Sequence, residues 1–271
     1  MNGASREALA AARERLDALT DSTSVDAAQL ADELAAVTAL LDREVSLRRV
    51  LTDPAQAADA KADLAGRILG GQVSGPTADL VAGTVRSRWS GSRDLVDALE
   101  ELAATADFTA AQRAGTLDDV EDELFRFGRI VASDTGLRSA LTDRSASTSA
   151  KSELLHSLLG GRAKATTERL VTRLVTAPRG RSLEAGLESL SKLAAERRNR
   201  AVAVVTSAVP LSDTQKRRLG AALAKLYGRA MHLNLDVDPE VLGGIRVRVG
   251  DEIINGSLAD RLEDAARRMA S

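Results

Sequence analysis

The sequence predicts a mainly α-helical protein with two tandem helical bundles, of about six helices each, followed by a small α/β domain. Up to Arg200, apolar residues recur at steps of three and four, which is the period of an amphipathic helix. After Arg200, apolar and polar residues alternate, as they do in strands. Together with an internal repeat, these patterns predict domains over residues 1–104, 105–200 and 201–271.

The composition restricts both the core and the chemistry. Of the 271 residues, 44% are hydrophobic but only 2% are aromatic, so the core must consist mainly of Leu, Val and Ala. The formal net charge of −2 argues against nucleic acid as the main ligand, because phosphate binding requires an excess of Lys and Arg. With no Cys and only two His, we expect no catalytic centre, no metal site and no cofactor.

The sequence also indicates how the protein relates to membranes. No apolar run approaches the roughly 18–20 residues that a helix needs to cross a bilayer. The first residues resemble a surface helix more than a signal peptide, because they carry acidic residues and have no apolar core segment. We therefore expect contact with a membrane only through partner proteins.

The helical region contains a repeat of about 90 residues. The matching positions include turn residues as well as apolar ones, so both copies should have the same fold. Glycine pairs in both copies suit helix C-termini. The clearest matches are Asp32-Glu33-Leu34 with Asp122-Glu123-Leu124, Leu51-Thr52-Asp53 with Leu141-Thr142-Asp143, and Leu69-Gly70-Gly71 with Leu159-Gly160-Gly161.

The join between the copies, Leu95 to Ala114, contains neither Pro nor Gly. We expect the last helix of the first copy to continue directly into the first helix of the second, which would give a rigid double bundle. A bend between Thr105 and Thr109 is the alternative. Trp89 also has two possible roles, since it could anchor a partner or fill the core of the first copy.

Four segments after residue 200 are predicted strands, and the last of them is the short segment Glu252-Ile253-Ile254. Residues 201–209 are β-branched and apolar on both faces, as in a covered strand. In residues 233–237 and 245–249, apolar and polar side chains alternate. A hairpin between these two segments would place Asp236 near Arg246 or Arg248.

Two helices are predicted beside these strands. Ser212 and Gln215 form a capping box for the first, which lies between the first two strands. Ser257 is the expected N-cap of a final helix.

The stretch from Val237 to Leu262, VDPEVLGGIRVRVGDEIINGSLADRL, resembles the C-terminal signature of the delta subunit of F-type ATP synthase, the oligomycin-sensitivity-conferring protein family. That signature runs through an acid and a turn, Gly-Gly, an alternating strand, Gly-Asp, an apolar pair and an Asp-Gly-Ser helix start. The one departure is Asn255, where Asp is usual. Residues from about 106 to 200 resemble the family's N-terminal helical domain, and the repeat explains the first 105 residues as a second copy of it.

The resemblance implies a non-catalytic stator subunit. In this family the helical domain binds the N-terminal segments of alpha subunits on the catalytic head, and beta subunits are possible further contacts. The C-terminal domain binds the distal end of the b subunits of the peripheral stalk. Such a link stops the head from spinning with the central stalk, and it implies a peripheral location on the cytoplasmic side of a bacterial plasma membrane.

The resemblance also implies two sets of contact residues. An alpha N-terminal helix would lie in a groove of the second bundle, between its first and fifth helices. Candidate lining residues for this groove are Phe108, Ala111, Leu170, Val171 and Leu174. Candidates for b-subunit binding, which are also suited to covering the sheet, are Leu219, Leu223, Leu226, Leu258, Leu262 and Met269.

Two alternatives remain open from the sequence. The chain could be a helical scaffold or regulatory adaptor unrelated to ATP synthase. Within the stator interpretation, the extra first bundle could bind a second alpha N-terminus or a lower part of the stalk, or it could only brace the second bundle.

Overall fold

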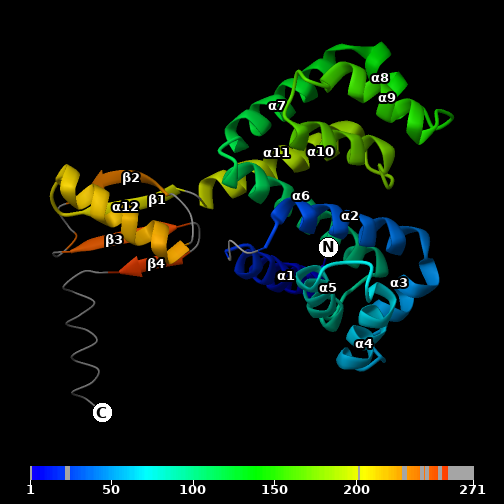
Figure 1. Ribbon diagram of the computed structural model, residues 1–271, viewed down its shortest axis with the longest axis horizontal. Helices are drawn as coiled ribbons and strands as arrows, with labels where there is room; N and C mark the ends of the chain where they lie inside the picture. The colour runs from blue at the N-terminus through cyan, green and yellow to red at the C-terminus, as the bar shows by residue number, and fades with distance from the viewer. Residues whose placement is uncertain are drawn as a thin grey trace. The chain divides into compact units, whose positions relative to one another are not determined.

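The computed structural model describes residues 2–21, 25–200, 202–227, 231–238, 241, 244–249 and 252–255. These residues form a mainly helical protein with a small sheet near the end of the chain, which confirms the predicted fold class (Figure 1). The chain divides into two compact units, Met1–Ala194 and Ala195–Ser271. None of the helices in the described ranges is long and apolar enough to cross a membrane.

The helical unit consists of amphipathic helices joined by short connections. In chain order the helices are α1 (Gly3–Asp21), α2 (Ala27–Arg43), α3 (Val45–Thr52), α4 (Ala58–Leu69), α5 (Gly75–Arg86), α6 (Ser92–Arg113), α7 (Leu117–Ser133), α8 (Thr135–Thr142), α9 (Thr148–Leu159), α10 (Ala165–Thr176) and α11 (Leu183–Arg200). The last of these extends past the end of the helical unit.

The repeat predicted from the sequence is present in the structure. Helices α2 to α5 and α7 to α10 have the same lengths in the same order, and Ala27 and Leu117 begin equivalent helices 90 residues apart. In both copies a glycine with positive φ follows the fourth helix, Gly71 at 73° and Gly161 at 69°. Each copy therefore ends this helix in the same way, in a conformation that glycine adopts without strain.

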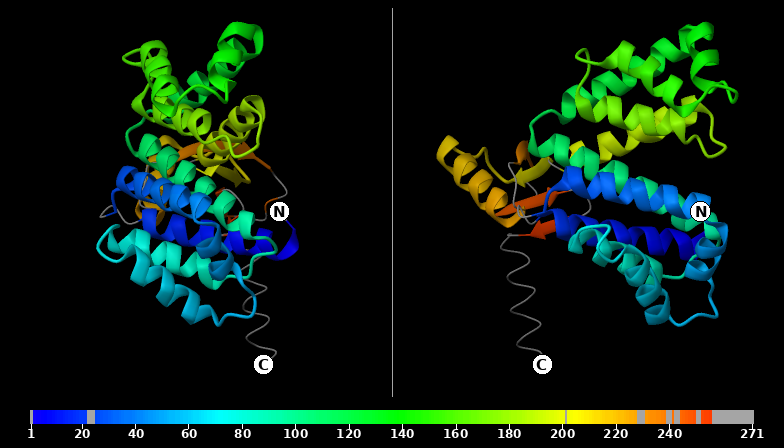
Figure 2. Two further views of the ribbon diagram at one scale, coloured as in Figure 1. Left: turned by 90° about the vertical axis from the view of Figure 1, so that its right-hand side faces the viewer. Right: turned by 45° about the vertical axis from the view of Figure 1, so that its right-hand side comes forward.

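The two bundles share α6. This helix of 22 residues is uninterrupted through Thr105 and Thr109, so the copies are joined by continuous helix as predicted. Its first half contributes Leu95 and Leu99 to the first hydrophobic core, and its second half contributes Phe108 to the second. Figure 2 shows α6 alongside α2, the pair of helices with the most extensive contact in the protein. The helix is thus both the last of one bundle and the first of the next.

A carboxylate on the second helix of each bundle caps the fifth helix. Glu33 on α2 accepts hydrogen bonds from the backbone N–H of Ser74, at 3.0 Å, and from the hydroxyl of Thr77. Ninety residues later, Glu123 on α7 accepts equivalent bonds from the N–H of Lys164, at 2.9 Å, and from Thr167. These contacts satisfy amide groups that a helix N-terminus leaves without partners, and they place a negative charge at the positive end of the dipole.

Trp89 belongs to the first core. Its side chain is buried, and its indole Nε1 donates a hydrogen bond to the carbonyl oxygen of Thr84 at 3.1 Å. Of its two predicted roles, filling the core is therefore the one that the structure supports.

The C-terminal unit contains a four-stranded sheet and one helix packed on it. The elements are β1 (Val202–Ser207), α12 (Asp213–Tyr227), β2 (His232–Val237), β3 (Ile245–Val249) and β4 (Glu252–Asn255). The predicted capping box is present, because the N–H of Ser212 donates to Gln215 Oε1 at 2.8 Å and the N–H of Gln215 donates to Ser212 Oγ at 3.3 Å.

The predicted hairpin between β2 and β3 is wrong. The strand order is β2-β1-β3-β4, and β1 pairs in parallel with β2 and antiparallel with β3. Two parallel strands need a crossover connection, which α12 supplies, and the other edge of β1 is then free for β3. Asp236 and Arg246 both pair with Thr206, from opposite sides, so they lie two strand spacings or about 10 Å apart.

Candidate partner-binding groove

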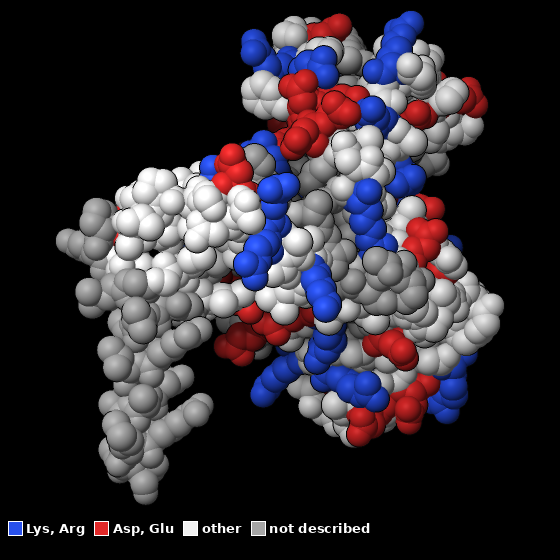
Figure 3. Space-filling view, turned by 60° about the vertical axis from the view of Figure 1, so that its left-hand side comes forward, with Lys and Arg blue, Asp and Glu red and all other residues white. Residues whose placement is uncertain are grey.

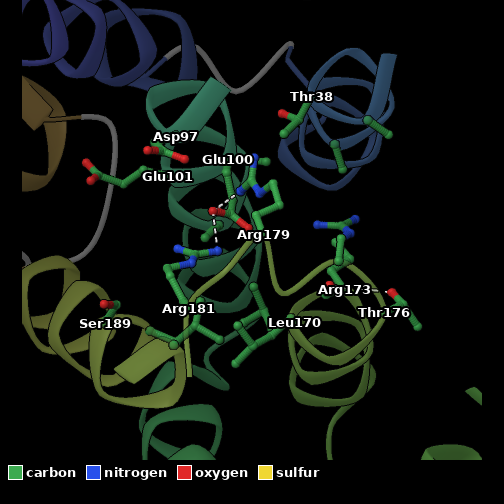
Figure 4. A pocket seen from close by; sticks show the side chains of 18 of the residues that line it. Thr38, Asp97, Glu100, Glu101, Leu170, Arg173, Thr176, Arg179, Arg181 and Ser189 are labelled. Atoms are coloured by element: carbon green, nitrogen blue, oxygen red, sulfur yellow. Dashed lines mark hydrogen bonds and ion pairs between the residues drawn. The ribbon is translucent and has the colours of Figure 1, made fainter. Parts of the chain in front are cut away.

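The helical unit contains an open groove of about 390 Å³ between helices of the two bundles (Figure 4). Its lining comes from α2 and α6, from α10 and α11, and from the segment that joins the last two helices. The volume falls within the range of about 300–1,000 Å³ that is typical of ligand sites in proteins. The groove is therefore large enough to receive several side chains of a partner.

The wall formed by the second bundle has a closely packed apolar part. Leu170 and Leu174 from α10 line it together with Leu190 and Leu193 from α11. The two helices approach closely at Gly186, where a built Cβ would lie 2.3 Å from Cδ1 of Leu174. Any side chain at this position would force Leu174 to shift, so the close approach favours glycine.

Two arginines hold the connection between α10 and α11 against α6. The guanidinium groups of Arg179 and Arg181 both pair with the carboxylate of Glu100, at 2.5 Å for Arg181 (Figure 4). Arg179 is buried and has a positive φ of 47°, and this burial together with the nearby Arg181 lowers the pKa of its guanidinium. It occupies the repeat position of Trp89, so a charged contact to α6 replaces an aromatic core residue in the second copy.

A buried carboxylate connects α6 with α10 and, through it, with α2. Asp107 is fully buried; its Oδ1 accepts hydrogen bonds from Arg169 at 2.9 and 2.6 Å, and its Oδ2 accepts one from Arg173 at 2.5 Å. Burial raises the pKa of Asp107, and the charges of Arg173 and Arg169 oppose that shift. Arg173 also donates to Asp32 on α2 at 2.5 Å. The ion cluster therefore ties the first bundle to the second beside the groove.

The structure brings together only part of the predicted groove set. All five residues belong to the second core, and of these Leu170 and Leu174 also line the groove, whereas Phe108, Ala111 and Val171 do not. The remaining lining residues were not predicted. Those on α2 belong to the additional copy, for which the family resemblance offers no guide.

The candidate residues for b-subunit binding differ in how exposed they are. Leu223 is buried against the sheet and Leu219 is partly buried, whereas Leu226 on α12 is 65% exposed. Of these three leucines, Leu226 is the one available to a partner. Leu258, Leu262 and Met269 lie outside the described residues.

The charged side chains on one face of the molecule are mixed in sign. On the face drawn in Figure 3, Lys and Arg lie among Asp and Glu, and neither sign covers the helical unit. In the described part of the chain there is no group of three or more His, Asp or Glu side chains that could hold a metal ion. An apolar groove on a helical repeat, with a separate sheet unit after it, is typical of an adaptor that binds other proteins.

Comparison with known proteins identifies which adaptor this is. The family model described as ATP synthase delta (OSCP) subunit matches residues 101–269, which is more than half of the chain. The chain belongs to this family, whose members are non-catalytic components of the peripheral stalk of ATP synthase. The match begins close to the end of the first copy of the repeat, so the family model covers the second bundle and the C-terminal unit.

Relatives named ATP synthase subunit delta match the whole chain. The chain is 83% identical over 270 residues to the protein of Streptomyces avermitilis, covering 100% of this chain and 99% of that protein. It is 82% identical over 271 residues to the protein of Streptomyces coelicolor, with coverage of 100% and 99%. It is 48% identical over 270 residues to the protein of Thermobifida fusca, with coverage of 100% of both. The additional first bundle is therefore shared by these relatives.

Proposed function

We propose that this chain connects the alpha subunits of the catalytic head with the b subunits of the peripheral stalk. The observation that carries this proposal is the apolar groove beside α6 and α10, which are the first and fifth helices of the second bundle. An amphipathic helix can bury its apolar face in such a groove. The chain makes and breaks no covalent bond in this function, since it acts by binding two partners and resisting the torque between them.

The two partners are assigned to different units of the chain. The helical unit carries the groove and receives the alpha N-terminal segment, with beta subunits as possible neighbours on the head. The C-terminal unit carries the exposed Leu226, which is suited to an apolar contact with a b-subunit helix. We place the protein at the cytoplasmic side of a bacterial plasma membrane, held there by the synthase, because its named relatives come from bacteria.

The proposal is tested with two variants of the full-length chain and two labelled synthetic peptides. One peptide carries the N-terminal segment of the cognate alpha subunit, and the other carries the distal helix of the cognate b subunit. Ser189→Trp places a large ring in the groove from α11, where Ser189 is exposed and lines the cavity. Leu226→Asp places a charge on the exposed face of α12.

Ser189→Trp should weaken binding of the alpha peptide at least tenfold, or about 1.4 kcal/mol, and leave the b peptide unaffected. Leu226→Asp should weaken binding of the b peptide and leave the alpha peptide unaffected. Fluorescence anisotropy gives both dissociation constants. Loss of both peptides in either variant, at an unchanged urea midpoint, would show that the division between the two partners is wrong.

A further inference from the structure

We propose that the first bundle supplies one wall of the groove, so that the partner helix touches both copies of the repeat at once. This inference rests on the proposed function, because it concerns the same groove and the same occupant. It assigns a role to the additional bundle: the bundle completes the binding site of the second copy.

The geometry of α2 carries the inference. Ala35, Thr38 and Ala39 line the groove from α2, together with Asp42 one turn further along the helix. Ala39 is exposed and Ala35 is partly buried, so these small side chains leave room between α2 and α10. The hydroxyl of Thr38 donates to the carbonyl oxygen of Leu34 at 2.7 Å, so it needs no partner in the groove. An apolar side chain can therefore approach Ala35, Thr38 and Ala39 without leaving a polar group unpaired.

The repeat provides an internal comparison for this face of the helix. On α7, the positions that correspond to Ala35 and Ala39 are Phe125 and Arg129, and both are exposed. Phe125 exposes 58% of its surface. Small residues thus occur on the copy of this helix that borders the groove, and large residues occur on the copy that does not. Small residues at a helix surface allow a second helix to approach closely, which is what a groove wall requires.

The ion cluster holds this wall in place. Asp32 on α2 pairs with Arg173 at 2.5 Å, and Arg173 also pairs with the buried Asp107 at 2.5 Å. On α7, the equivalent residue Asp122 pairs within its own helix, with Arg126 at 2.9 Å. The contact between α2 and α10 beside the groove is therefore specific to the first copy, and it sets the distance between these helices.

The charges at the rim indicate the chemistry of the occupant. The carboxylate of Glu100 is shared by Arg179 and Arg181 of the second bundle, so this cluster keeps a net positive charge. Asp42 and Asp97 line the groove from the α2 and α6 side, and Asp42 already lies 3.7 Å from a guanidinium nitrogen of Arg48. The occupant that fits is an amphipathic helix with an apolar stripe for the groove and a Lys or Arg beside it, facing Asp97.

Three variants of the full-length chain test the composite site, with the labelled alpha N-terminal peptide as probe. Ala39→Trp fills the groove from the first bundle, and Ser189→Trp fills it from the second. Arg129→Trp adds the same ring at the position on α7 that corresponds to Ala39, outside the groove. All three substitutions replace exposed residues, and the urea midpoint of each variant checks that it is folded.

We expect Ala39→Trp and Ser189→Trp each to weaken binding at least tenfold, while Arg129→Trp stays within twofold of the parent. If peptide binding is weakened by Ser189→Trp but not by Ala39→Trp, the first bundle does not contribute to the site, and the proposed function stays intact. No loss with either groove variant would remove the groove as the head-binding site, and the proposed function at this site would fall with the inference. Loss with Arg129→Trp as well would also overturn the inference, because the effect would then not depend on the groove.

The charge of the occupant is tested separately. Asp97→Asn should weaken binding of the same peptide about threefold at low salt and leave it nearly unchanged at 1 M salt, where screening is strong. Binding that is equally salt-independent in the parent and in the variant would contradict a basic flank on the occupant.

Discussion

Replacing the buried carboxylate of Asp107 with an amide should destabilise the helical unit by about 2–4 kcal/mol. Asp107→Asn preserves the size of the side chain but removes its charge and leaves one carbonyl oxygen in place of two carboxylate oxygens. That carboxylate accepts three hydrogen bonds from Arg169 and Arg173. The amide N–H groups of Asn would face guanidinium donors, which cannot accept a hydrogen bond.

The magnitude follows from the burial of the three groups. Breaking a buried ion pair by removing one partner costs about 3–5 kcal/mol, because a charge is left buried without compensation. Here the groups left behind are not fully buried, since the side chains of Arg169 and Arg173 are 31% and 28% exposed. They can regain part of their hydration, which lowers the expected cost to the stated range.

Urea denaturation of the full-length chain measures this effect with two probes. With a slope of about 2–3 kcal/mol/M, a loss of about 3 kcal/mol lowers the midpoint by about 1 M. Circular dichroism follows all helices, whereas the fluorescence of Trp89, the only Trp, follows the first core. Because α6 runs through both cores, the two transitions should move together although the mutation lies in the second.

Asp122→Asn is the matched control. Asp122 is 62% exposed and pairs with Arg126 one turn away on α7, so its replacement should cost less than about 0.5 kcal/mol. A midpoint shift for Asp107→Asn no larger than that of the control would refute the argument from burial. A shift seen by circular dichroism but not by Trp89 would show that the bundles unfold independently.

Three further predictions concern stability. Burial acts to raise the pKa of Glu33, but hydrogen bonds from Ser74, Thr77 and Gln29 outweigh it and hold that pKa below 4.5. The ionised Glu33 therefore stabilises the fold above pH 4.5, and this stabilisation is lost as the pH falls through its lower pKa in the folded protein. Glu33→Gln should accordingly show a smaller drop in urea midpoint between about pH 5 and pH 3 than the parent does. An equal drop in both proteins would contradict this. Gly186→Ala should cost about 1–3 kcal/mol, because the new methyl group would collide with Leu174, and an unchanged thermal midpoint would show that Leu174 can move aside. Leu223→Ala should destabilise the C-terminal unit by about 2–5 kcal/mol, while Leu226→Ala should cost less than about 0.5 kcal/mol, as measured by urea denaturation. Equal costs would mean that Leu226 is packed like Leu223.

Local interactions explain which predictions were confirmed. A capping box joins residues three positions apart, so Ser212 and Gln215 could be paired from their spacing alone. The glycines after the fourth helix of each copy were recognised for the same reason, since a helix ends where the backbone adopts positive φ. The repeat added a second test of every such assignment, because each feature occurs twice.

The sequence did not decide what depended on distant elements. The alternation of β2 and β3 showed that both are strands, but not that β1 lies between them. The apolar stripe of α10 showed which face avoids water, yet it did not distinguish Val171, which lies in the core alone, from Leu170 and Leu174, which belong to the same core and also line the groove. The same periodicity serves a core and a partner equally well, because both remove the side chain from water.

The sequence by itself determined the class of fold, the repeat, the uninterrupted helix between the copies and the family. Each of these depends on the order of residues along the chain or on contacts within a few turns of helix. Only the tertiary structure decided how the two bundles combine. Asp32 and Arg173 are 141 positions apart, and nothing in their local sequence pairs them. They meet because the shared α6 brings α2 and α10 to the same side, and the groove between the copies is a consequence of that packing.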